Sequence, residues 1–73
     1  MIDANLPARV ADMRAWALSR INWCRRAEYK FASDTDAYLE AAVERRALVA
    51  VLEQLGLSVP AVTDEQIAEW RSP

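Results

Sequence analysis

The apolar residues of the first 32 positions recur at the spacing of one face of a helix. From Leu6 to Ala32 the chain has no glycine, and its only proline, Pro7, lies in the first turn, where a missing N–H does no harm. At about 100° per residue, one stripe holds the apolar positions Leu6, Val10, Met13, Ala17, Ile21, Cys24 and Phe31. The pattern predicts a helix over residues 6–32, with Asn5 as its N-cap and this stripe facing a core.

A second helical pattern follows a short polar segment. Ser33 and Asp36 resemble a capping box, and the next run has no proline and ends at Gly56, the only glycine. Its seam alternates steps of three and four residues through Tyr38, Ala41, Arg45, Leu48, Leu52 and Leu55. We predict a second helix over residues 35–55. Because the turn before it is short, this helix is expected to run antiparallel to the first.

The last part of the chain combines an apolar connector with a third helix. Residues 57–62 read as an extended segment that lies on the hairpin, and Thr63 with Gln66 forms a capping box. Ile67 and Trp70 would hold a helix over residues 64–71 against the hairpin. The expected fold class is all-α: an antiparallel helical hairpin plus a short C-terminal helix, in a single domain over residues 1–73.

Composition sets limits on the environment of the protein. Apolar residues make up 53% of the 73 residues and charged residues 27%, which is typical of a globular domain. No run of about 18 apolar residues exists, and the first residues lack the pattern of a signal peptide. The lone Cys24 has no partner for an internal disulfide and suits a reducing compartment. We therefore expect a cytoplasmic protein that does not engage membranes.

The inventory of reactive side chains is small. The chain has no histidine and one cysteine, which argues against a structural zinc site and removes the usual general base. Cys24 falls on the core stripe, where a cysteine acts as a small apolar residue. Glu40 and Glu44 could hold a divalent cation, although such a pair is more often a solvated surface. The sequence therefore predicts no enzyme, no cofactor and no metal site.

Tryptophan and arginine gather on one flank of the first helix. Trp16 and Trp23 are seven residues apart and lie about 80 to 100° from the centre of the core stripe. The neighbouring positions on this flank are Arg9, Arg20 and Ala27. Tryptophan and arginine are enriched at binding hot spots, so the five residues form a predicted partner-binding surface. The alternative is that the third helix, which carries Trp70, covers both rings within one monomer.

The second helix has a further apolar surface that lies away from its seam. It consists of Leu39, Val43, Ala47 and Ala50. One facing helix cannot bury both surfaces, so the connector, the third helix or a second copy of the chain must cover this one. A chain of this size rarely has a sufficient core of its own. We therefore expect these four residues to mediate self-association, as a homodimer that forms a four-helix bundle.

Charge is divided unevenly along the chain. Residues 1–33 carry six basic and three acidic side chains, whereas residues 34–73 carry three basic and eight acidic ones. A basic helix could follow the phosphates of a nucleic acid. The arginines spread around the helix, however, and the net charge is −2. This distribution favours pairing between the basic helix and its acidic neighbour.

Residues 40–56, EAAVERRALVAVLEQLG, resemble the small Ala- and Arg-rich helical proteins of bacteriophages and prophages. The resemblance implies a protein that binds a larger host protein and blocks or redirects it. The expected function is thus a small non-enzymatic protein-interaction module. Two alternatives remain open: a nucleic-acid-binding protein that uses the first helix, and a structural or assembly protein that mainly self-associates.

Overall fold

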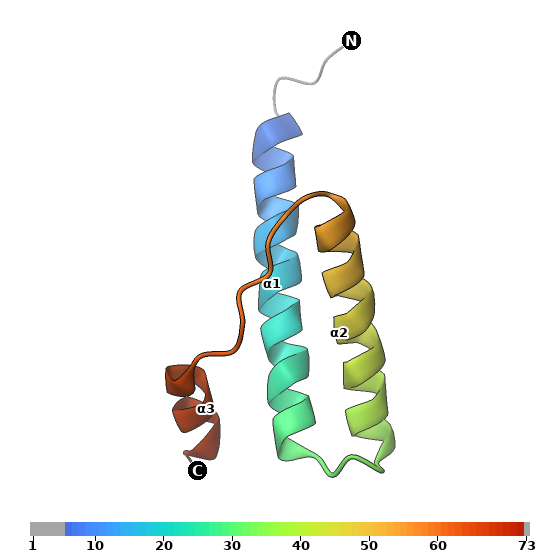
Figure 1. Cartoon of the computed structure of the whole chain (residues 1–73), viewed down its shortest axis with the longest axis vertical. Coiled ribbons are helices and arrows are strands. Elements are labelled where there is room, and N and C mark those ends of the chain that lie inside the picture. Colours follow the sequence, from blue (N-terminus) through green and yellow to red (C-terminus); the bar gives the residue numbers. More distant parts are fainter. Residues whose placement is uncertain (1–5, 73) are drawn as a thin grey trace.

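The computed structural model describes residues 6–72 as three helices (Figure 1). α1 spans Leu6–Lys30, α2 spans Asp36–Gln54 and α3 spans Asp64–Arg71. Figure 1 shows α1 and α2 side by side and antiparallel, while the connector crosses α1 and places α3 on its other side. The predicted hairpin with a short third helix is therefore confirmed. The predicted N-cap, Asn5, lies outside the described residues.

The turn between α1 and α2 differs from the prediction in its capping residue. Thr35 is the N-cap of α2: its side-chain oxygen accepts a hydrogen bond from the Tyr38 N–H at 3.3 Å, and its hydroxyl donates to the Ala32 carbonyl at 2.7 Å. The predicted capping box at Ser33 is wrong, because Thr35 directly precedes the first helical residue. Phe31 follows the end of α1 and is 50% exposed, so it is not a core residue as predicted.

Gly56 ends α2 as the sequence predicts. Its φ angle is +77°, the left-handed conformation that glycine adopts without a steric cost. The Gly56 N–H donates to the Glu53 carbonyl at 3.0 Å, and the Leu57 N–H donates to the Leu52 carbonyl at 2.9 Å. This pair of bonds is a Schellman motif. It turns the chain so that the connector packs on the hairpin.

The core of the hairpin is narrow and made mostly of small residues. The buried side chains are Ala17, Ile21, Cys24, Ala27, Ala41, Ala42 and Leu52. Leu57 and Val59 of the connector pack against the cluster around Ile21 and Leu52. Small residues allow the two helices to approach closely, but they bury little apolar surface. Ile21 and Leu52 are the two large aliphatic residues in this core.

The apolar stripe of α1 continues beyond the region that α2 covers. Val10 is 41% exposed and Met13 is 64% exposed, and Leu55 at the end of α2 is 60% exposed. These predicted core positions are wrong. For Val10 and Met13 the reason is the lengths of the helices: α1 has 25 residues and α2 has 19, so the first turns of α1 extend past the end of α2 (Figure 1). Leu55 is the C-cap that follows α2. Leu6 is a further predicted core position, but its side chain lies outside the part of the chain that the structure describes.

α3 is fixed to the C-terminal half of α1. The predicted capping box is present, with Thr63 and Gln66 exchanging hydrogen bonds of 3.0 and 3.1 Å. The rings of Trp70 and Tyr29 lie 5.9 Å apart, and Arg71 Nε donates to the Tyr29 hydroxyl at 2.8 Å. These contacts place α3 on the Tyr29 side of α1.

Candidate protein-interaction face

The two tryptophans of α1 are exposed to solvent. Trp16 is 63% exposed and Trp23 is 53% exposed. α3 does not cover them, because its contacts lie at Tyr29, about 120° around α1 from Trp23. The alternative that the third helix buries both rings is therefore wrong. We call the exposed surface on this side of the hairpin the tryptophan face. It comprises Met13, Trp16 and Trp23 of α1, Phe31 just after α1, Val51 of α2 and Leu55, the C-cap of α2.

Arg20 holds Trp23 in place on this face. Its guanidinium carbon lies 4.1 Å from the centroid of the Trp23 ring, a distance typical of a cation–π contact. The same guanidinium forms two hydrogen bonds to the Glu44 carboxylate, from Nε to Oε2 at 2.5 Å and from Nη2 to Oε1 at 3.1 Å. The ion pair joins α1 to α2 and fixes the plane of the guanidinium. Trp23 is thus oriented by the fold before any partner binds.

Cys24 and Glu44 form a second contact beneath this ion pair. The Cys24 thiol is fully buried and donates a hydrogen bond to Glu44 Oε2 at 2.9 Å. Burial and this bond raise the pKa of Cys24 to about 12, and the bonds from Arg20 and Cys24 lower the pKa of Glu44. A neutral buried thiol is a poor nucleophile. The Glu44 side chain is 40% exposed, so it is partly solvated as expected, but Arg20 and Cys24 also donate hydrogen bonds to its oxygens.

The remaining predicted residues of the flank occupy different environments. Arg9 is exposed on the second turn of α1. Ala27 is only 8% exposed and packs with Cys24 and Ala41, so it lies in the core beneath the tryptophan face. Ala27 also lines the hollow beside Trp23, and its role as a partner contact stays a prediction. The flank retains Arg9, Trp16, Trp23 and the partly buried Arg20 as residues that a partner could touch.

Two hollows lie on the tryptophan face, at opposite ends of the hairpin. One hollow lies at the end of the hairpin away from the α1–α2 turn, and we call it the open-end groove. It has a volume of about 400 Å³, and its apolar lining includes Val10, Met13, Trp16, Val51, Leu52 and Leu55. The loop-end pocket has a volume of about 180 Å³ and is lined by residues that include Trp23, Phe31, Arg20, Glu40 and Glu44. The lining of the open-end groove is thus mainly apolar, whereas the loop-end pocket is lined by both apolar and charged side chains. The groove was not predicted, although a comparison of the predicted lengths of the two helices would have indicated it.

The outer face of α2 is also exposed. Leu39 is 50% exposed and Val43 is 65% exposed, and Ala47 and Ala50 are exposed as well. Among the described helices, α3 contacts α1 and not α2, and the connector packs on the other side of the hairpin. The sequence left three elements that could cover this face: the connector, the third helix or a second copy of the chain. The connector and α3 are therefore excluded. Self-association through these four residues stays a prediction.

Several basic side chains of the chain serve the fold itself. Arg25 Nη1 donates to the Pro60 carbonyl at 2.8 Å, and Arg14 Nη2 donates to the Ser58 carbonyl at 3.4 Å. Arg45 of α2 forms hydrogen bonds of 2.7 and 2.9 Å to Glu28 of α1. Together with Arg20, these residues tie α1 to α2 and to the connector. The ion pairs of Arg20 and Arg45 neutralise two of these positive charges.

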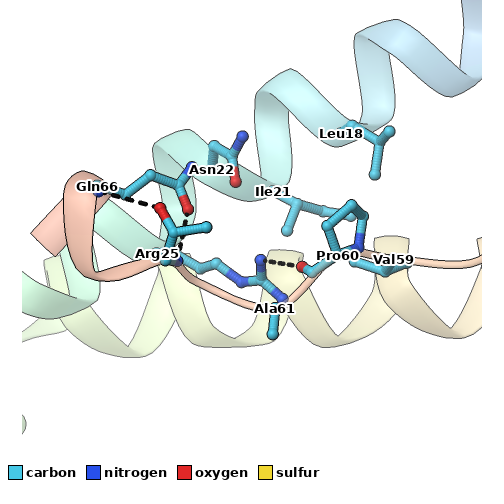
Figure 2. Close-up of a pocket in the computed structure, with 9 residues that line it drawn as sticks. Leu18, Ile21, Asn22, Arg25, Val59, Pro60, Ala61 and Gln66 are labelled. Atoms are coloured by element: carbon cyan, nitrogen blue, oxygen red, sulfur yellow. Dashed lines mark hydrogen bonds between the residues drawn. The ribbon is translucent and has the colours of Figure 1, made fainter.

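A further cavity, of about 390 Å³, lies between the connector and α1 (Figure 2). Figure 2 shows Arg25 crossing it to reach Pro60, and Gln66 turned towards the start of α3. The hydrogen bonds of both side chains hold the connector and the N-terminal end of α3. Its apolar wall is formed by Leu18, Ile21 and Val59. We therefore regard this cavity as part of the packing between the connector and the hairpin.

Two searches of the described residues bear on other kinds of site. No three His, Cys, Asp or Glu side chains within residues 6–72 lie close enough to hold a metal ion. In the same range, no helix combines the length and apolar character needed to cross a membrane. No known protein family, curated protein or solved structure matches the chain.

Proposed function

We propose that the chain is a small non-enzymatic protein-interaction module that binds its partner through the tryptophan face. The observation that carries this proposal is the exposure of Trp16 and Trp23, each more than half accessible on a helix that packs along α2. Large exposed apolar surface on a monomer is typical of an interaction site. Tryptophan contributes strongly to such sites because a large rigid ring loses little conformational entropy on binding.

The state of the reactive groups supports a function without catalysis. The Cys24 thiol is buried and neutral, and Glu44 is bound to Arg20 and Cys24. A nucleophile would need an adjacent base and access to substrate, and neither the thiol nor this carboxylate offers both. The module therefore acts stoichiometrically, by covering a surface of its partner.

The partner that we propose is a larger protein in the cytoplasm. The resemblance of residues 40–56 to small phage proteins favours a regulator or inhibitor that blocks a host protein. A nucleic acid is a weaker candidate, because Arg14, Arg20 and Arg25 make contacts within the chain. A structural or assembly role is the second candidate, and the exposed outer face of α2 favours it.

The proposal can be tested by capture of partners from the native host. Tagged wild-type chain and the variants Trp16→Ala and Trp23→Ala are compared by quantitative mass spectrometry. The matched control is Leu39→Ala, which also removes a half-exposed apolar side chain but lies on the outer face of α2. We expect one protein that wild type and Leu39→Ala retain and that the Trp23 variant loses. Equal capture by all four chains would contradict the proposed surface.

A further inference from the structure

The loop-end pocket combines aromatic side chains with a carboxylate that the fold does not use. Trp23 and Phe31 line the pocket, and each of the two side chains is at least half exposed. Glu40 of α2 also lines it and is exposed. Among the described residues, no hydrogen bond or ion pair engages the Glu40 carboxylate. This carboxylate is therefore available to a binding partner.

The charges around the pocket favour a positively charged occupant. Among the described residues that line it, Arg20 is the basic one, and its guanidinium is bound to the Glu44 carboxylate. Arg26 and Lys30, in the last turns of α1, line a separate hollow beside α3. Because Arg20 and Glu44 neutralise each other, Glu40 adds a negative charge that no other lining residue balances.

The size of the pocket suits a single side chain. Its volume of about 180 Å³ is below the roughly 300 to 1,000 Å³ of small-molecule sites. A partner that covers Trp23 also covers this pocket and removes Glu40 from water. An unpaired carboxylate is costly to bury, so an apolar side chain fits poorly there, and an acidic one is repelled. A cationic side chain pairs with Glu40 and gains from contact with an aromatic ring.

We infer that the partner protein inserts an arginine side chain into the loop-end pocket. A guanidinium can donate two hydrogen bonds to a carboxylate while its flat face lies on an aromatic ring, which an ammonium group cannot do. The fold already contains this arrangement, since Arg20 lies over the Trp23 ring and donates to Glu44. The partner's arginine repeats it with Glu40. This inference rests on the proposed function and names the chemistry of the partner.

A metal ion is a weaker occupant of the same pocket. Glu40 and Glu44 are its two acidic lining residues among those described, but the Glu44 oxygens already accept hydrogen bonds from Arg20 and Cys24. A divalent cation would have to displace these donors. An arginine needs only the Glu40 carboxylate and leaves the ion pair between α1 and α2 intact.

The test is a nuclear magnetic resonance titration of the full ¹⁵N-labelled chain at low salt with two probes. One probe is N-acetyl-arginine amide, and the other is N-acetyl-citrulline amide, which has the same shape without the charge. We expect only the arginine probe to shift the Trp23 indole N–H and the Phe31 amide signals. Glu40→Gln should raise its dissociation constant about fivefold. Glu53→Gln is the matched control, because it removes an exposed carboxylate of the same helix outside the pocket.

Saturable shifts that weaken in Glu40→Gln and not in Glu53→Gln support the inference. Equal responses to the two probes, no response of Trp23 and Phe31, or equal weakening in the two variants overturn it. Circular dichroism checks that both variants keep the wild-type helicity.

The capture experiment separates this inference from the proposed function. Glu40→Gln should lose much of the protein that wild type and Glu53→Gln capture. Capture that is lost in Trp23→Ala but unchanged in Glu40→Gln overturns the inserted arginine and leaves the tryptophan face as the binding surface. Capture that does not depend on Trp23 contradicts the proposed function, and the titration then still decides whether the pocket binds a guanidinium.

Discussion

Replacement of Ile21 by alanine should bring the hairpin close to unfolding. Ile21 is 1% exposed and is one of two large aliphatic residues in a core otherwise built from alanine and cysteine. The change removes three carbon groups, each contributing about 0.8 kcal/mol of transfer free energy, and leaves a cavity that adds to the loss. The total is about 3 to 4 kcal/mol. A 73-residue domain has about 4 to 11 kcal/mol of stability in all.

The assay is urea unfolding followed by circular dichroism at a concentration where the chain is monomeric. With a slope of about 1 kcal/mol per molar urea, the midpoint should fall by about 3 M. Met13→Ala is the control, because it lies on the same sequence stripe but is 64% exposed, and it should cost less than about 0.5 kcal/mol. Equal losses in the two variants, or a loss below about 1 kcal/mol for Ile21→Ala, would refute the reasoning.

Three further predictions concern pH and a helix end. Because burial raises the pKa of Cys24 from 9.0 to about 12, the unfolded chain ionises first, and the free energy of unfolding should fall between pH 9 and about 12; Cys24→Ala should remove this fall. The lowered pKa of Glu44 acts in the opposite range: its stabilisation is present above pH 4.5 and is lost as the pH falls through the folded value, and a pH series of urea melts should show no such loss in Glu44→Gln. Gly56→Ala should destabilise the fold by about 1 kcal/mol in thermal melts, because its φ of +77° strains any residue with a Cβ atom.

The helix ends were predictable because they depend on neighbouring residues. Gly56 takes the left-handed conformation and Thr63 forms its capping box with Gln66, as the sequence indicates. The N-cap of α2 was misassigned within the same segment, because Ser33 and Thr35 are both good capping residues and only the backbone distinguishes them. Local chemistry therefore predicts that a helix ends, and it places that end to within about two residues.

The exposed core positions could not be read from periodicity. A stripe at helical spacing identifies a face of α1, but it contains no information on how far the facing helix extends. Val10 and Met13 have the same spacing as Ile21 and differ from it only in lying beyond the end of α2. Helix lengths, which the caps do predict, hold this information.

The contacts of the tryptophan face depend on pairs far apart in the sequence. Arg20 and Glu44 are separated by 24 positions, and the register of the hairpin alone brings them together. The position of Trp23 on a flank was visible in the sequence, but its stacking on Arg20 and its exposure of 53% were not. The sequence therefore located the candidate surface, and the structure shows what holds it.

The accessibility of Trp23 in the free chain and in a complex tests the central claim most directly. In a chain carrying Trp16→Phe and Trp70→Phe, Trp23 is the sole tryptophan, so its fluorescence reports on the face alone. With the chain monomeric, acrylamide should quench this emission readily, because the ring is 53% exposed. Addition of the captured protein should shift the emission to shorter wavelength and protect it from quenching. Protection in the free chain, or unchanged quenching in the complex, would contradict the account.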